Sequence, residues 1–292
     1  MAAVGVSFVS LLNAVAWHCR LPSVSYLWEL DGNDILLAGV ELALPSDESP
    51  SKTMGHTLLS DLSLGDDNER ICVRVSRFWA FCDQKDDDKI LHFGLVLIDE
   101  KGTSIAAQIY PPCDEIFRPI ITEGKVYYIK YFRVRKCNRQ YKPVDNCMSI
   151  YFTRWTKLEE RVDPPAEIPL YTYSLSPFGG LRSRVGKKDS FTDIIGIITQ
   201  LSPVTPLQGT VKRSVFIRNT DNAILNVALW GERATSFPAD EVFVAGQKEP
   251  QIVIFVGTLV KGYGDVSLSG NSACKWYINA DTPEVISLRN SI

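Results

Sequence analysis

The same succession of short β-rich runs occurs twice along the 292 residues, and this repeat constrains the fold more than any other feature. In the first copy, ICVRVSRF at 71–78 alternates apolar residues with others, which predicts a strand with one buried and one open face. The turn at 99–102 ends in glycine, which suits the positive φ of a tight hairpin turn. A short helix is expected within 111–124. Further strands are expected at 91–99, 104–110, 126–135 and 148–155.

The second copy follows the same order about 120 residues later. It has a turn at 220–222, a short helical region at 231–243 and a terminal helix that begins at Pro283, a residue favoured at the first helical position. Two copies of β-β-β-α-β-β describe an all-β fold of two tandem OB-fold barrels, each a five-stranded Greek key with a short helix. The strands of the second copy are expected at 191–201, 211–219, 223–230, 251–260 and around 266–268.

Composition divides the chain into four segments. Residues 1–53 are an N-terminal appendage, expected to be poorly ordered or to hold a short helix at 10–17. Its apolar start also allows a signal peptide, although the positive residues that open such signals are missing. Residues 54–160 are the first OB domain and 191–292 the second. Residues 161–190 are the linker, in which prolines stiffen the first half and glycines loosen the second.

Charge is distributed unevenly along a chain whose formal net charge is −3. Residues 125–157 hold nine Lys or Arg side chains and eight aromatic rings against one acid, whereas residues 1–69 carry ten acids and two bases. Cations that track phosphates, beside rings on which bases stack, predict a single-stranded nucleic-acid site. The alternative is that the alternating cations form a solvated sheet face, which is their more common role.

The sequence gives no support to chemistry other than binding. Its seven cysteines are irregularly spaced without a CxxC pair and its three histidines are scattered, so no metal site is expected. Because no nucleophile motif or phosphate-binding loop is present, we expect no catalytic residues, no cofactor and no enzymatic activity. The cysteine pattern fits a reducing compartment. No apolar run reaches the roughly 20 residues of a membrane helix.

Several motifs resemble one known family. The first copy carries ICVRV and VYYIKYFRVRKCNRQY, and the second carries NVALWGERATSF and GTLVKGYGDVSLSG. Through these motifs, residues 58–292 resemble the two central single-strand-binding OB domains of the large, 70 kDa DNA-binding subunit of replication protein A, the first half being closest to plant-type members. Further matching motifs are DIIGI at 193–197, VKRSVFI at 211–217 and INADTPEVISLR at 278–289.

The resemblance implies which residues contact nucleic acid. Tyr141, Trp230 and Tyr263 match stacking aromatics of the family. A further stacking ring of the first domain falls on Leu91 or Phe93, and the alignment leaves both open. Leu259 stands where the family commonly has arginine. The cations expected to contact phosphates, from the motifs and from strand alternation, are Arg74, Arg133, Arg135, Lys212 and Lys261.

The predicted function is sequence-tolerant binding of single-stranded DNA in replication, repair and recombination, in the nucleus, with the linker letting both barrels engage one strand. The family's N-terminal recruiting domain and its C-terminal OB domain with zinc ribbon and trimerising helix are not in this sequence. Other replication protein A subunits are therefore only candidate partners beside single-stranded DNA. One alternative is a protein-interaction module or truncated paralogue that has lost DNA binding. Another is an RNA binder on the same barrels.

Overall fold

The structure is a computed structural model and describes residues 55–83, 86–164, 167–207 and 209–292. The chain divides into Met1–Lys52 and Thr53–Ile292. The expectations for residues 1–53 lie outside the described residues. Among the helices of the described part, none has the length and apolar character needed to cross a membrane.

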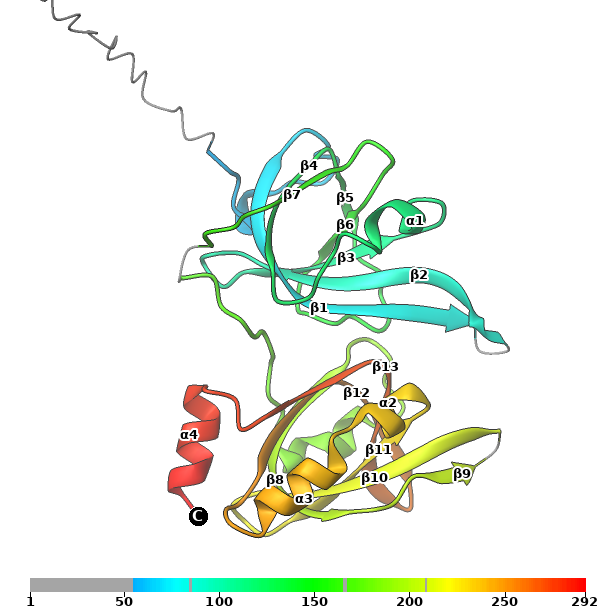
Figure 1. Cartoon of the computed structure of the whole chain (residues 1–292), viewed down its shortest axis with the longest axis vertical. Helices are drawn as coiled ribbons and strands as arrows, with labels where there is room; N and C mark the ends of the chain where they lie inside the picture. The colour runs from blue at the N-terminus through cyan, green and yellow to red at the C-terminus, as the bar shows by residue number, and fades with distance from the viewer. Residues whose placement is uncertain (1–54, 84–85, 165–166, 208) are drawn as a thin grey trace, which may run out of the picture. The chain divides into compact units, whose positions relative to one another are not determined.

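The first β-sheet has seven strands in the order β5-β6-β3-β2-β1-β4-β7. Neighbouring strands are antiparallel except β3 and β6, which are parallel. β1 and β2 form a long hairpin that extends beyond the rest of the sheet (Figure 1). The strands are β1 (Arg70–Asp83), β2 (Asp86–Ile98), β3 (Ser104–Ile109), β4 (Val126–Lys130), β5 (Arg133–Lys136), β6 (Met148–Tyr151) and β7 (Lys157–Glu160).

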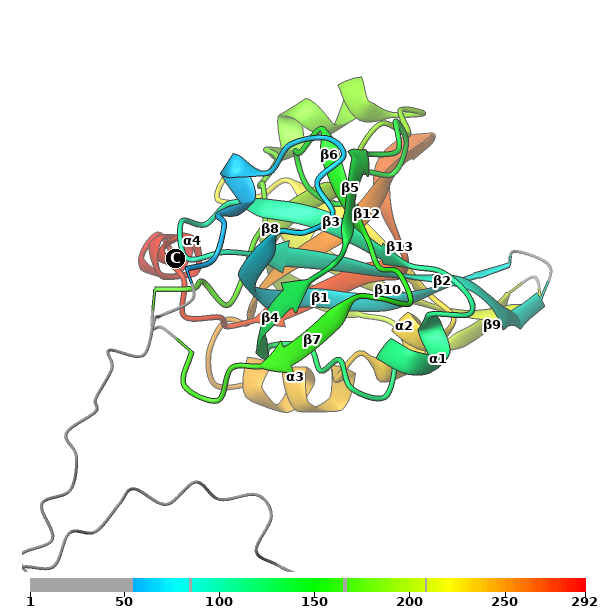
Figure 2. The same cartoon turned by 90° about the horizontal axis from the view of Figure 1, so that it is seen from above.

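The structure divides the single strand expected at 126–135 into β4 and β5. Tyr131 has a φ of 61°, and the next residue, Phe132, is fully buried in the core. The bend takes the chain from its ladder with β1 to a new ladder with β6. Two distant strands of the sheet are therefore joined by one bent segment, which curls the sheet into an OB-type half-barrel. β7 extends the sheet alongside β4 (Figure 2).

A β-bulge in β1 changes which of its side chains face outward. Two successive positions of β2 pair with three positions of β1, so Ser76 is an extra residue. An extra residue shifts the alternation of a strand by one. After the bulge, Phe78 and Ala80 pack against the core. Trp79 and Phe81 therefore point away from the core, although the alternation that begins at residue 71 would bury them.

The core of the first barrel lies between the curled strands and is closed by helix α1 (Asp114–Phe117). Phe117 packs edge-on against Phe152, with ring centroids 5.0 Å apart. The buried Tyr127 hydroxyl accepts a hydrogen bond from the backbone N–H of Thr122 and donates one to the carbonyl of Ile120. These bonds satisfy a polar group inside the core and fix the segment after α1.

The second β-sheet has six strands in the order β11-β13-β12-β8-β10-β9, and a further pairing of β10 with β11 closes it. With β9 at the edge, the closed part is the expected five-stranded barrel. Helices α2 (Glu232–Ser236) and α3 (Ala239–Gly246) occupy the expected helical region. The strands are β8 (Thr192–Leu201), β9 (Thr205–Leu207), β10 (Thr210–Arg218), β11 (Ile224–Trp230), β12 (Ile252–Tyr263) and β13 (Asp265–Ile278).

The linker packs on the barrels. Ile168 is buried beside Cys72 of β1, which covers the face of ICVRV that the sequence predicts to be open. The segment Phe178–Arg184 forms a 3₁₀ helix whose Leu181 is buried in the core of the second barrel. The glycines of the second half thus sit beside a packed segment, because Leu181 provides an apolar anchor that composition alone does not reveal.

Helix α4 (Pro283–Asn290) begins where the sequence predicts, with Pro283 in its first turn. Its Val285 packs on the outer side of β8 and β12. Two linker tyrosines, Tyr171 and Tyr173, complete this small outer cluster. The outer face of β8 and β12 is therefore covered, which leaves the opposite strands β10 and β11 as the place to look for a binding face.

Candidate nucleic-acid interface

A row of aromatic rings crosses the outer face of the first barrel. Phe81 and His92 have ring centroids 4.9 Å apart, and His92 and Tyr110 are stacked at 5.0 Å. Tyr110 and Tyr151 follow at 6.2 Å with their planes only 4° apart. The four rings come from β1, β2, the residue after β3, and β6, which are consecutive strands of the sheet. We call this set the ring row.

The ring row is accessible and next to a flat surface. Phe81 is 41% exposed and Tyr110 is 44% exposed. Trp79 lies over Gly94, where an added Cβ would come within 2.4 Å of the indole, so only glycine leaves room for the ring. Exposed, parallel rings are suited to stacking with bases, since every base has a π-face.

Cations border the ring row where β5 runs beside β6. The guanidinium carbon of Arg135 lies 5.4 Å from the centroid of Tyr151, within range of a cation–π contact. Arg133 pairs with Tyr151 across the ladder and is exposed, as is Arg135. The alternation predicted for this strand is correct, because Val134, between the two arginines, is buried. Both expected cations therefore accompany the rings.

Tyr141 lies in the loop 137–147, which joins β5 to β6. Its φ is 57° and its side chain is 39% exposed. Its backbone N–H donates to the carbonyl of Lys188 at 2.6 Å, and its ring centroid lies 6.0 Å from that of Phe191. The loop is thus attached to the end of the linker, with Tyr141 presented at its surface.

Arg74 differs from the expectation of a phosphate contact. Its guanidinium donates hydrogen bonds to the carbonyls of Gly124 at 2.6 Å, Ile168 at 3.0 Å and Pro169 at 3.1 Å. Partial burial lowers the pKa of this guanidinium. With its donors used by the backbone, Arg74 ties β1 to the linker, and we assign it no contact with nucleic acid.

Neither residue considered for the second ring of the first domain forms part of the ring row. Phe93 is only 4% exposed and stacks on Phe78 inside the core, at 5.2 Å. Leu91 is exposed but carries no ring. The outward ring of this strand is His92, and partial burial lowers the pKa of its imidazole. Burial likewise raises the pKa of the neighbouring Tyr110 hydroxyl, so both groups favour their neutral forms.

The second barrel presents one ring and one cation at matched positions. Lys212 of β10 pairs directly with Trp230, the last residue of β11. The Lys212 ammonium lies 5.6 Å from the indole centroid. Leu229 is fully buried, so Trp230 projects to the opposite, outer side, as the sequence predicts.

Small side chains separate this pair from Lys261. Ala228 is in register with Ser269 of β13, and Ser269 is in register with Leu259 of β12. One step along, Lys261 pairs with Ser267 and is exposed. We call Lys212, Trp230, Lys261 and this small-residue floor the second face. Tyr263, at the end of β12, pairs with Asp265 across the hairpin.

Sequence reasoning thus located part of the site and missed the ring row. It named Arg133, Arg135, Tyr141, Lys212, Trp230 and Lys261, which the structure places on or beside the two faces. It treated Tyr151 as a packing residue, whereas the ring is half-buried and stacked on Tyr110. The bulge at Ser76 hides Phe81, since it reverses the alternation. A run of aromatics at the strand ends was the only signal for Tyr110.

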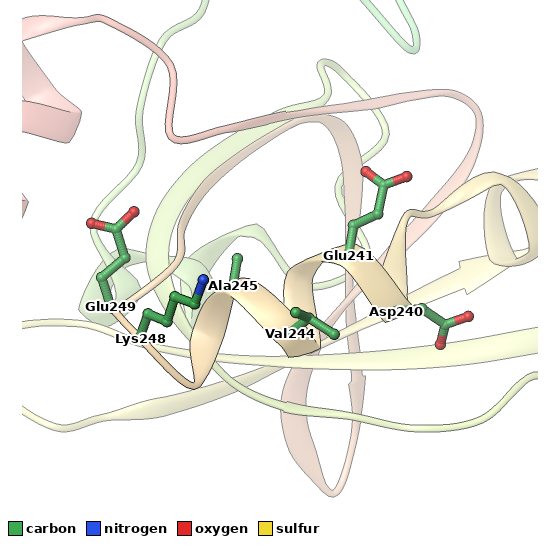
Figure 3. A pocket seen from close by; sticks show the side chains of 6 residues that line it. All are labelled: Asp240, Glu241, Val244, Ala245, Lys248 and Glu249. Carbon is green, nitrogen blue, oxygen red and sulfur yellow. The ribbon is translucent and has the colours of Figure 1, made fainter.

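A surface cavity of about 710 Å³ lies on α3 and the turn after it (Figure 3). Asp240, Glu241 and Glu249 line it together with a single cation, Lys248. An excess of carboxylates repels a phosphate backbone, so this cavity is not a nucleic-acid site.

Comparisons with known proteins agree with the two-barrel division. Residues 61–181 match a family described as a domain of unknown function, DUF223, and residues 184–279 match the replication protein A OB domain. The "Replication protein A 70 kDa DNA-binding subunit" of Gallus gallus is 29% identical over 230 residues, covering 75% of this chain and 35% of that protein. A 70 kDa DNA-binding protein of replication protein A from Arabidopsis thaliana is 27% identical over 204 residues, covering 68% and 33%.

The chain therefore spans about a third of the length of these curated relatives. Among solved structures, a replication protein A heterotrimer bound to ssDNA aligns with 80% of this chain and 54% of its own. The TM-score is 0.58 at 25% sequence identity.

Proposed function

We propose that this chain, whose two OB barrels belong to the replication protein A large-subunit family, binds single-stranded DNA without strong sequence preference and without catalysis. The observation that carries the proposal is the ring row, with Arg133 and Arg135 beside it. Stacked rings that border exposed cations suit a strand whose bases are unpaired, because duplex bases are already stacked on one another.

The mechanism has two parts. Phosphates are attracted by Arg133, Arg135 and Lys212, and bases then stack on the ring row, Tyr141 and Trp230. Each base stacked on an aromatic side chain contributes about 1–3 kcal/mol. Tyr263 and Lys261 are proposed as further contacts of the second barrel. Joining the two barrels in one chain raises the effective concentration of the second site once the first is occupied.

The biological setting proposed is DNA replication, repair and recombination in the nucleus. Relatives that are named DNA-binding subunits of replication protein A support it, as does the aligned heterotrimer bound to ssDNA. Other subunits of that assembly are candidate partners, since the aligned protein is part of a heterotrimer.

A fluorescence-anisotropy titration tests the proposal, using labelled oligo-dT, matched oligo-U and a duplex of the same length. We expect oligo-dT to bind most tightly and the duplex most weakly. The logarithm of the affinity should fall linearly with the logarithm of the salt concentration, with a slope of about −0.7 for each phosphate contact. Equal binding of duplex and single strand would contradict the stacking mechanism. A chain that binds none of the three would instead support the protein-interaction alternative.

A further inference from the structure

Two cysteines face each other at the base of the loop that carries Tyr141. The backbone N–H of Cys137 donates to the carbonyl of Cys147 at 2.9 Å, which continues the ladder of β5 and β6 by one pair beyond Lys136 and Met148. Directly opposed residues of antiparallel strands carry their side chains on the same face. In hydrogen-bonded pairs the Cα atoms are about 5.5 Å apart. Disulfides span Cα distances of about 4.4–6.8 Å.

Both thiols are open to a small reactant. Cys147 is exposed and Cys137 is half-buried, and they line a surface cavity of about 560 Å³. The same cavity is lined by Lys136, Arg139 and Lys142, so an anionic reactant would be attracted to it. The two cysteines are therefore close to each other and accessible together.

The other described cysteines lack this arrangement. In their ladders, Cys72 faces Tyr128 and Cys82 faces Ile90. Cys274 is buried, and burial raises the pKa of its thiol to about 12, which suppresses the reactive thiolate. Cys113 precedes α1, where burial raises the pKa of its thiol.

We propose that Cys137 and Cys147 form a reversible disulfide that ties the base of the loop 137–147. The oxidant is a small disulfide such as oxidised glutathione. The thiolate of Cys147 attacks one of its sulfurs, forming a mixed disulfide and releasing one glutathione thiolate. The thiolate of Cys137 then attacks the Cys147 sulfur and releases the second. Two protein thiols lose two protons and two electrons, and one glutathione disulfide is reduced to two thiols.

The bond is expected to be labile. Cβ atoms of directly opposed residues are about 4.5–5.5 Å apart, whereas a disulfide prefers a Cβ separation of about 3.8 Å. Closing it therefore draws the two strand ends together. Strained or exposed disulfides have the higher reduction potentials typical of regulatory pairs. The pair should thus respond to changes in the thiol balance of a reducing compartment.

The consequence for binding rests on the proposed function. The loop tip is already attached through the Tyr141 N–H to Lys188 and the Lys142 N–H to the carbonyl of Asp189, at 3.1 Å. A disulfide would restrain the base as well, so the loop would be held at both ends. Binding that requires a conformational change associates more slowly. Oxidation should therefore slow the association of single-stranded DNA several-fold, and reductant should restore it.

Peptide mapping tests the disulfide itself, independently of DNA. The whole chain is equilibrated in buffers of increasing oxidised-to-reduced glutathione ratio, alkylated, digested with trypsin and analysed by mass spectrometry. Lys136 and Arg139 bracket Cys137, so trypsin releases it in a peptide separate from that of Cys147. We expect these two peptides to appear linked, at ratios where Cys72 and Cys274 are still alkylated. Glutathione attached to Cys147 without any linked peptide would overturn the proposal.

Variants extend the test to the loop. Cys147→Ser should abolish the linked peptide and make the DNA association rate insensitive to the glutathione ratio. The matched control Cys113→Ser should leave both responses as in the original chain. Equal association rates of the oxidised and reduced forms would overturn the restraint on the loop. A linked peptide in a chain that binds no DNA would leave the disulfide standing and reject the proposed function.

Discussion

The two barrels share a fold but present different binding faces. The first carries a row of four rings across four strands, bordered by Arg133 and Arg135. The second carries one ring, Trp230, beside Lys212 on a floor of small residues. The same topology therefore supports a face with several possible stacking positions and a face with one described position. Stacking should contribute most of the affinity on the first barrel.

Removing two members of the ring row should have the largest effect. Tyr110→Ala combined with Tyr151→Ala deletes adjacent rings, and each base that loses its partner costs about 1–3 kcal/mol of binding free energy. Affinity for oligo-dT, measured by anisotropy, should fall more than for any single variant below. The control Phe243→Ala removes an equally exposed ring from α3 and should leave affinity unchanged. Unchanged affinity in the double variant would remove the ring row from the site.

Trp230→Ala tests the second face. We expect a loss of about 1–3 kcal/mol in binding of an oligonucleotide long enough for both barrels, because one base loses its stacking partner. The same titration measures it, and Phe243→Ala again serves as control. A loss greater than that of the double variant would reverse the comparison and make the second barrel the stronger binder.

Arg74 and Arg135 should separate stability from binding. Arg74→Gln removes charged donors from three backbone carbonyls. It should lower the free energy of unfolding by about 1.5–3 kcal/mol in a urea titration, since that is the usual contribution of a hydrogen bond to a charged group. Arg135→Gln should leave unfolding unchanged and reduce the salt slope of DNA binding by about 0.7. The opposite pattern would restore Arg74 as a phosphate contact.

The smallest effect concerns pH and His92. Because burial lowers the pKa of its imidazole in the folded chain, the unfolded chain binds the proton more readily. The resulting stability is fully present above the ordinary pKa of about 6.5 and is lost as the pH falls through the lowered folded value. Protonation also adds a cation to the ring row, so affinity for oligo-dT should rise over the same fall in pH. His92→Phe keeps a ring and should abolish both dependences, and their persistence would assign them to another group.

Much of the fold followed from local pattern. Alternation around Val134 and Leu229 placed Arg135 and Trp230 on the outer faces, and both neighbours are buried as expected. The turn glycine Gly102 has the positive φ that its position requires, 77°. These features depend on a few neighbouring residues, which is why the sequence sufficed for them.

Other features depend on contacts between distant residues. One extra residue, Ser76, turns Trp79 and Phe81 outward, and a bulge leaves no distinctive mark in an alternating sequence. Ile168 covers β1 from nearly a hundred positions away and supplies a carbonyl to Arg74. A basic residue in a strand looks the same whether its partner is a phosphate or a backbone carbonyl.

The sequence by itself determined the order of strands, the two-barrel division and the identity of the outward Trp230, because period-two alternation is a local property of the chain. Only the tertiary structure decided that four rings from four strands align, that Arg74 is used by the linker, and that Cys137 faces Cys147. The reason is register: which residues become neighbours across strands is set by bulges, bends and loop lengths acting together.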